Sequence, residues 1–457
     1  MNHTQVHLSR SVSFFKNDRV IALVVAMLVI SVSLAMASAL GNTQSASSPA
    51  LISARDQIVQ TTSAPQEAQT GFDGAPNGMV DPLVHQADQM VFEEEESPEK
   101  GLGPIYNATS CAGCHGTPVT GGVSQVTELR AGYRNSFGQF INPDVTVGDG
   151  TVVIKSRSLI NDRAVCPSAA FSNNEVQEHV PDQANVKAFR TSLNSLGDGY
   201  VEAIPDITLL QIAAKQCKSG TLICGQPIAV PVLEAPGQTR IARFGWKNQH
   251  ASLLSFAADA YLNEMGVTSP LQPQDVVTSM CKTTADPEDP PDQDGLADID
   301  RFARFMRASK APARDETLAA TLDAQLGADI FDRIGCDNCH VSAIITAPAG
   351  STINGGAFVV PDALGNKIIH PYSDFLLHNV GTGDGIVQNG GQQTAMKLRT
   401  PPLWGVRLRS RMMHDGLSMT FQDAIQRHGG EAAGVIHNYR NLTDQDRSRL
   451  ISFLKSL

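Results

Sequence analysis

Two short motifs in the sequence combine a pair of cysteines with a histidine at a fixed spacing. Residues 111–115 read CAGCH and residues 336–340 read CDNCH. Two thiols spaced by two residues can bond both vinyl groups of a haem, and the histidine that follows is then placed beneath the iron as an axial ligand. Zinc is the main rival for paired cysteines, but neither motif alone supplies a full tetrahedral ligand set. The motifs therefore predict two covalently bound c-type haems.

The two predicted haem sites use equivalent residues. The tethers and the axial ligand of the first haem are predicted to be Cys111, Cys114 and His115. Those of the second haem are predicted to be Cys336, Cys339 and His340.

The opposite face of each iron decides what the site does. A strong sixth ligand gives an electron carrier, whereas an open face gives a site for peroxide or oxygen. No histidine lies between His115 and His179, so the first iron is predicted to be open. His179 or His250 could still reach it from farther along the chain.

The segments that lead into the two motifs are similar, which predicts two cytochrome c-like domains in a mainly α protein. An aromatic residue lies five positions before the first cysteine of each motif, at Tyr106 and at Phe331. Helices are expected over 316–333 and after Thr443, which can cap a helix whose apolar face carries Leu450, Ile451 and Leu454. The stretches TVVIKS and PIAVPVL suggest strands, so the first domain is expected to carry an inserted β-rich section.

Composition divides the chain further. Residues 40–98 are rich in Ser, Ala, Gln and Pro and are predicted to form a flexible linker. The N-terminal haem domain is expected over 99–285 and the C-terminal one over 297–457. Between them, the loop 286–296 contains DPEDPPDQDG, whose prolines and aspartates exclude a core element. Its aspartates are suitable calcium ligands, although the spacing matches no known loop and a solvated linker is the alternative.

Residues 1–39 have the pattern of an export signal. Basic residues precede the apolar run VIALVVAMLVISVSLAMASA, and alanines at 35, 37 and 39 form a cleavage site. An uncleaved membrane anchor is the alternative. The formal charge of residues 40–457 is −13, which disfavours nucleic acid and anionic membranes as partners. We expect a periplasmic protein with no stable membrane insertion after cleavage.

Export also places the cysteines in an oxidising compartment, where spare thiols tend to pair. Four cysteines lie outside the two motifs, and Cys217 and Cys224 flank the short loop KSGTLI. A local disulfide between these two would leave Cys166 to pair with Cys281, although four cysteines allow three pairings.

Several longer segments resemble a known family. They are 243–270 (RFGWKNQHASLLSFAADAYLNEMGVTSP), 294–307 (DGLADIDRFARFMR), 371–381 (PYSDFLLHNVG) and 398–405 (LRTPPLWG). With them the chain resembles, over roughly residues 100–457, the di-haem oxidoreductase family of peroxidases and thiol oxidoreductases. That family is related to the bacterial dihaem cytochrome c peroxidases.

The resemblance implies a sixth ligand for the second haem. In the peroxidases, the methionine that binds this haem follows the histidine of an HDG-like segment by fourteen residues. Here that histidine is His414, and the equivalent position is His428. The resemblance therefore implies a His340/His428 haem. Met412, Met413 and Met419 are the alternative ligands.

The resemblance also bears on the acid that assists peroxide cleavage. The glutamate of the peroxidases falls at Ser255 or Phe256, so it is absent. Glu264 is the candidate replacement, because proton transfer between the peroxide oxygens needs a nearby acid or base. A helix-end glutamate that faces water is the alternative. By resemblance alone, Asp374, His378 and Arg399 are expected to contact haem propionates or the other domain.

These observations predict an exported dihaem c-type oxidoreductase of the peroxidase type, in which the C-terminal haem relays electrons to a reactive N-terminal haem. The expected partners are a small soluble electron donor, such as a cytochrome c or a cupredoxin, and hydrogen peroxide or another small oxidant. A dihaem oxygenase and a non-enzymatic two-haem electron carrier are the alternatives.

Overall fold

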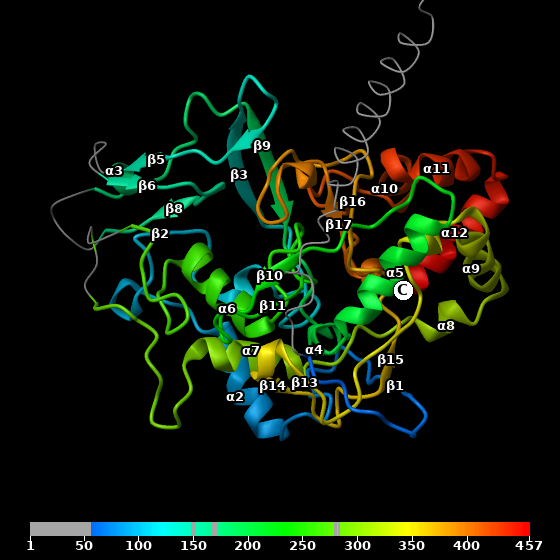
Figure 1. Cartoon of the computed structure of the whole chain (residues 1–457), viewed down its shortest axis with the longest axis horizontal. Coiled ribbons are helices and arrows are strands. Elements are labelled where there is room, and N and C mark those ends of the chain that lie inside the picture. Colours follow the sequence, from blue (N-terminus) through cyan, green and yellow to red (C-terminus); the bar gives the residue numbers. More distant parts are fainter. Residues whose placement is uncertain (1–55, 148–151, 167–171, 278–280, 282–283) are drawn as a thin grey trace, which may run out of the picture. The chain divides into compact units, whose positions relative to one another are not determined.

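The computed structural model describes residues 56–457, except for 148–151, 167–171, 278–280 and 282–283 (Figure 1). The predicted export signal over 1–39 lies outside the described residues. None of the helices in the described part of the chain combines the length and the apolar character needed to cross a membrane.

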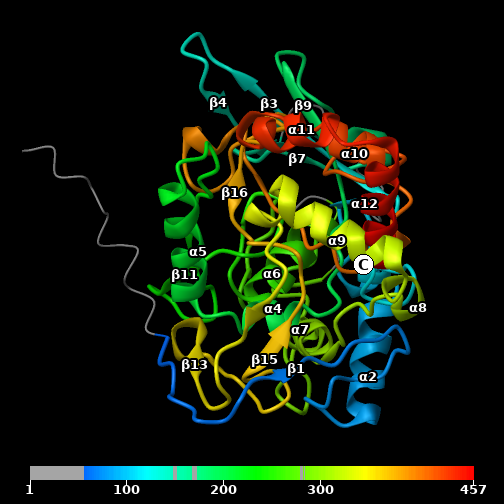
Figure 2. The ribbon, with the colours of Figure 1, turned by 90° about the vertical axis from the view of Figure 1, so that its right-hand side faces the viewer.

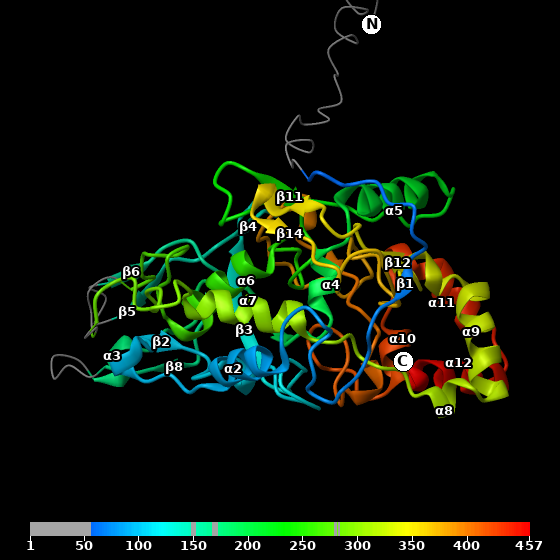
Figure 3. The ribbon, with the colours of Figure 1, turned by 90° about the horizontal axis from the view of Figure 1, so that it is seen from below.

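One helix organises the core of the first half. Helix α7 (Asp298–Ala308) packs against α2 (Pro82–Glu93), α4 (Asp198–Glu202) and α6 (Leu253–Ala260). Its apolar residues, among them Ile299, Phe302 and Phe305, recur at helical spacing and face inward. Figure 3 shows α2 and α7 side by side, and there Phe92 of α2 contacts Phe302 edge to face at 5.9 Å between ring centroids.

Helices precede the second motif and follow it near the end of the sequence. Helices α8 (Glu316–Ala319) and α9 (Leu322–Ile334) replace the single helix predicted over 316–333, because Thr321 caps a new helix by accepting a hydrogen bond from the Ala324 amide at 3.3 Å. Helix α12 (Asp444–Ser456) packs against α9 (Figure 2). Its predicted cap is confirmed, since Thr443 accepts from the Asp446 amide at 3.1 Å.

Strands are present where the β-rich section was predicted. Strand β3 (Thr127–Arg134) pairs antiparallel with β9 (Val186–Thr191), and β7 (Leu159–Ile160) and β4 (Phe140–Ile141) also pair with it. The predicted strand stretches contain β6 (Val152–Ile154), which pairs with β5 (Val145–Val147), and β10 (Ala229–Pro231), which pairs with β11 (Thr239–Ile241).

The described part of the predicted linker is not a featureless tether. Strand β1 (Gln66–Glu67) pairs with β15 (Lys367–Ile369), which also pairs with β12 (Ile344–Ile345). Helix α2 follows, with Pro82 at its first turn and Asp81 as its cap. Only a few residues of this helix, His85, Asp88 and Phe92, are buried, so its apolar pattern is too weak to predict it from the sequence.

The predicted boundary loop joins elements that pack together. Helix α7, which follows the loop, packs on elements that precede it, and all described residues belong to one compact unit. The loop aspartates have partners within the protein: Asp289 accepts the Asp298 amide at 2.7 Å, and Arg301 lies 3.1 Å from Asp292 and 3.0 Å from Asp294. Calcium binding by this loop stays a prediction.

The remaining helices and strands of the described residues are short or peripheral. They are β2 (Ile105–Tyr106), β8 (Arg163–Ala164), α3 (Asn173–Val176), α5 (Asp206–Lys218), β13 (Thr352–Ile353), β14 (Phe358–Val359), β16 (Leu377–His378), β17 (Leu398–Arg399), α10 (Phe421–Gln426) and α11 (Ala433–Arg440).

Candidate functional site

The two cysteine–histidine motifs adopt the same local conformation. Each begins with a short 3₁₀ turn, Cys111–Gly113 or Cys336–Asn338. In each, the histidine amide donates to the carbonyl of the first cysteine at 3.0 Å. The four motif cysteines are free thiols, whereas the other four form the disulfides Cys166–Cys281 and Cys217–Cys224. The predicted pairing is thereby confirmed, and the motif thiols stay available for another bond.

Four histidines line a cavity of about 190 Å³ at the second motif: His340, His378, His414 and His428. Two of them, His340 and His428, have Nδ1 bound to a backbone carbonyl. His340 donates from Nδ1 to the Tyr372 carbonyl at 2.9 Å, and His428 donates from Nδ1 to the Ala424 carbonyl at 2.8 Å. In both rings Nε2 is left with its lone pair, which is the form that binds a metal. Burial lowers the pKa of His340 to about 4 and also lowers the pKa of His428, so both are neutral.

Short local elements place His428 in this cavity. Helix α10 ends just before it, and the His428 amide donates to the Ile425 carbonyl at 3.1 Å. Of the alternative ligands, Met412 and Met413 also line the cavity. Met419 does not line it, and 58% of its surface is exposed.

A second, larger cavity of about 380 Å³ lies at the first motif. His115 is the one histidine among its lining residues, and its Nδ1 donates to the Gly122 carbonyl at 3.3 Å. His250 and His179 do not line the cavity. The ring of His250 instead lies 3.1 Å from Asp259 and stacks on Phe256.

Glu264 lines the first cavity and is held there by neighbours. Its carboxyl accepts from the Asn107 amide at 2.6 Å and is hydrogen-bonded to the carboxyl of Glu128. Burial, reinforced by the negative charge of Glu128, raises the pKa of Glu264 to about 8. Glu264 is therefore protonated at neutral pH and can donate a proton.

Glu128 was not predicted from the sequence as a site residue. Burial opposes its ionisation, but Arg130 and Arg190 outweigh this effect and lower its pKa. Arg130 forms a bidentate pair with it at 2.8 and 2.7 Å, and Arg190 lies 3.8 Å away. The spacing of Glu128 and Arg130 could have indicated this pair, because residues two apart lie on the same face of a strand, and this strand also carries buried residues.

Ser255 and Phe256, where the peroxidase glutamate was expected by resemblance, have other contacts. The hydroxyl of Ser255 is buried and donates to Glu234 at 2.6 Å. Phe256 lines the first cavity but offers no proton.

Two side chains line both cavities, Trp246 and Arg399. The indole nitrogen of Trp246 donates to the Thr191 carbonyl at 2.8 Å, and its ring contacts His414 edge to face at 6.1 Å. Arg399 is buried and donates to the Gly245 carbonyl at 2.9 Å. The other tryptophan, Trp404, lies in the main hydrophobic core.

These features fit haem better than zinc. Within the described residues, the two thiols and the imidazole of a motif nowhere converge to within 4.8 Å, as a shared metal ion would require. Each cavity instead presents two thiols and a neutral imidazole whose Nδ1 is bound to a backbone carbonyl, and the lining of the second cavity is largely apolar. The lining of the second cavity includes Leu398, Pro401, Leu403, Phe421, Ile425 and Val435.

The family comparison agrees with this donor set. A family model described as "Di-haem oxidoreductase, putative peroxidase" matches residues 128–457. No curated relative matches the sequence. Among solved structures, hydrazine synthase from Kuenenia stuttgartiensis is similar at 14% identity, covering 88% of this chain and 99% of its own, with a TM-score of 0.34.

Two further solved structures are similar. The diheme peroxidase BthA from Burkholderia thailandensis shows 13% identity over 89% of this chain and 94% of its own, with a TM-score of 0.33. A MauG-like protein associated with microbial copper homeostasis shows 20% identity over 35% of this chain and 52% of its own, with a TM-score of 0.23. The family assignment rests on the family model, which spans well over half of the sequence and includes the second motif, His428 and Glu264. The chain belongs to the di-haem oxidoreductase family, as the resemblance predicted, and is an oxidoreductase.

Proposed function

We propose that the protein is an exported peroxidase in which the two motifs carry covalently attached haem c groups with different roles. The observation that carries this proposal is the unequal supply of imidazoles. His340 and His428 each present Nε2 to the second cavity, which His378 and His414 also line, whereas His115 is the one histidine that lines the first. Two strong axial ligands suit electron transfer, and one leaves a face for a small oxidant.

In the first cavity, a bound haem would supply the iron at which a peroxide oxygen–oxygen bond is cleaved. The residues of the chain would manage the protons. Glu128, ionised between two arginines, can accept a proton, and Glu264, protonated at neutral pH, can donate one. Because the two carboxyl groups share a hydrogen bond, one proton can serve the pair.

Trp246 and Arg399 would connect the two sites. A buried aromatic side chain that lines both cavities is suitably placed for electron transfer between them. The buried guanidinium of Arg399 offers a positive charge to carboxylate groups of a cofactor on either side.

The charge of the side chains that line the first cavity distinguishes a peroxidase from an oxygenase. Eight Asp, Glu and Arg side chains line this cavity: Glu128, Arg130, Arg157, Arg190, Asp198, Asp259, Glu264 and Arg399. An oxygenase for an apolar substrate would need an apolar tunnel at this site. The charged lining favours a small polar oxidant such as hydrogen peroxide.

Steady-state turnover tests this proposal. The holoprotein would be supplied with hydrogen peroxide and a small reduced cytochrome c or cupredoxin, and oxidation of the donor would be followed. We expect peroxide-dependent oxidation with two donor electrons consumed per peroxide. A holoprotein with both haems that oxidises none of these donors would contradict the proposal.

A further inference from the structure

A buried histidine beside the second motif lies between two carboxylates. His378, at the end of β16, is 1% exposed. Its Nε2 lies 2.8 Å from Asp374 Oδ2, and its Nδ1 lies 2.8 Å from Glu431 Oε2. Because each ring nitrogen donates to a carboxylate, the imidazole carries both protons and a positive charge.

The electrostatics agree with this geometry. Burial alone would lower the pKa of His378, but the Asp374 carboxylate and hydrogen bonds to Asp374, Cys339 and Glu431 raise it to about 12. The cation therefore persists across the physiological pH range.

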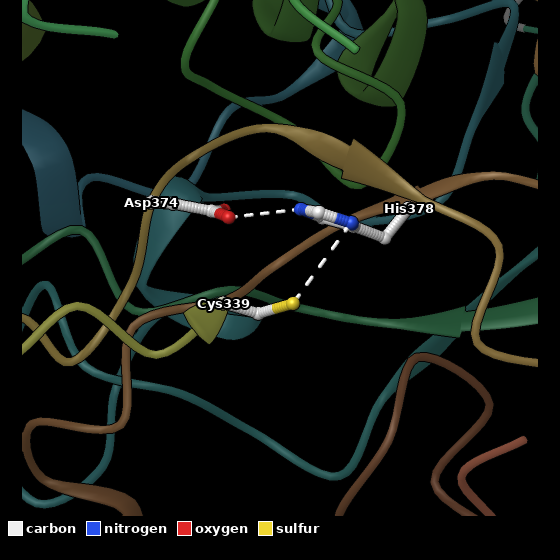
Figure 4. Close-up of side chains that lie close together, drawn as sticks. All are labelled: Cys339, Asp374 and His378. Carbon is white, nitrogen blue, oxygen red and sulfur yellow. Dashed lines mark hydrogen bonds and ion pairs between the residues drawn. The ribbon is translucent and has the colours of Figure 1, made fainter. Parts of the chain in front are cut away.

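This cation lies at a haem tether. The Nδ1 of His378 is 3.9 Å from Cys339 Sγ, and His378 lines the second cavity. Figure 4 shows the ring between the Asp374 carboxylate and the Cys339 sulfur, bonded through opposite nitrogens. A metal ion at this cluster would have to displace the ring from a carboxylate. We therefore interpret His378 as a fixed positive charge, and not as a metal ligand.

A glutamine next to a disulfide holds one carboxylate in place. Gln216 Nε2 donates to Asp374 Oδ2 at 2.7 Å and to the Asn338 carbonyl, inside the second motif, at 2.6 Å. Its Oε1 accepts from the Gly225 amide at 3.0 Å. Gln216 precedes Cys217, and Gly225 follows Cys224. The contact between Gln216 and Gly225 therefore connects the disulfide hairpin to the network of His378, Asp374 and Glu431.

The hairpin also reaches the other carboxylate. The Cys224 amide donates to Glu431 Oε2 at 3.1 Å, and Glu431 follows His428 by three residues. The backbone of Gly225 lies so close that a β-carbon there would be 2.8 Å from the His378 ring. The Cys217–Cys224 disulfide thus braces the network from outside.

From this geometry we propose that His378 is a positioning residue for the second haem. As a buried cation it raises the reduction potential of that haem, and the Cys217–Cys224 hairpin holds it in place. A positive charge next to the haem favours the state with one more electron, and the low local dielectric keeps the effect strong. The inference rests on the proposed attachment of a haem at Cys336 and Cys339.

A redox titration of the holoprotein, followed by the absorption of each haem, tests this inference. In H378Q we expect the midpoint of the second haem to shift to lower potential, while that of the first haem stays unchanged as an internal control. The matched control is H370Q, because His370 is also paired with a glutamate, Glu67 at 3.0 Å, but is about half exposed. A second-haem midpoint in H378Q equal to that of H370Q would overturn the inference.

A second variant separates charge from general loosening. E431Q removes a negative charge and keeps an oxygen that can accept from His378, so the second-haem midpoint should shift to higher potential. Loosening alone would shift both variants in the same direction, and that result would overturn the role assigned to the cation.

The double variant C217S/C224S tests the brace. With the hairpin released, we expect a shift in the direction of H378Q but smaller, and no shift would overturn the bracing role. If the wild-type chain binds no haem at the second motif, the proposed function itself is wrong. If it binds haem there and the H378Q midpoint is unchanged, this inference alone is wrong.

Discussion

The first and second motifs begin alike and end in different surroundings. In both, a 3₁₀ turn presents two thiols and a histidine whose Nδ1 is bound to a carbonyl. His428, just after α10, then brings a second Nδ1-bound imidazole to the CDNCH cavity, whereas strands β3 and β9 bring one carboxylate, Glu128, and two arginines to the CAGCH cavity. The same tether can therefore serve electron transfer or acid–base chemistry, depending on the elements packed above it.

Removing the second imidazole should abolish most of this difference. In H428A the second haem loses one strong axial ligand, so we expect its low-spin absorption to convert to high-spin, with the first haem unaffected. The variant H437A, at an exposed position of α11, is the control. An unchanged H428A spectrum would eliminate His428 as a ligand.

Removing the acid Glu264 should strongly reduce turnover at the first site and leave the second site unchanged. We expect E264Q to lower peroxide turnover by about 100-fold, because an amide cannot donate and recover the proton. The spectrum and midpoint of the second haem should not change. E316Q, on the exposed start of α8, is the matched control, and equal turnover by the two variants would exclude Glu264 as the acid.

The same carboxyl group predicts a pH dependence. The pKa of Glu264 is raised to about 8, so the proton is present below that pH and lost above it. Peroxide turnover should hold up to about pH 8 and then fall by about tenfold per pH unit, as expected for a single ionisation. In E264Q this step should disappear from the pH profile of the residual rate. A step that persists there would have to come from another group.

The smallest effect is expected where the two sites meet. W246F keeps an apolar aromatic ring but loses the indole, so electron transfer from the second haem to the first should slow while each spectrum stays the same. Stopped-flow mixing of the reduced protein with peroxide would measure that rate. W404F, in the core, is the control. Equal rates in the two variants would place the electron path elsewhere.

The local parts of this description could be read from the sequence. The cysteine spacings and the cap at Thr443 each depend on residues close together in the chain, and the structure contains them. His428 came from resemblance, since nothing local marks a ligand 88 residues after its partner His340.

What escaped prediction depends on long-range packing. Helix α2 has too few buried positions to stand out, and its contact with α7 joins segments more than 200 residues apart. Glu128 looks like an ordinary charged strand residue until β3 carries it to Glu264. The pairing of His378 with Glu431 likewise exists only in the folded chain.

The central claim is that the two haem sites differ in their free coordination positions, and cyanide binding tests it most directly. Electron paramagnetic resonance of the oxidised holoprotein should show one high-spin and one low-spin haem, and cyanide should convert the high-spin signal alone. Two low-spin haems that ignore cyanide in both redox states would contradict the account.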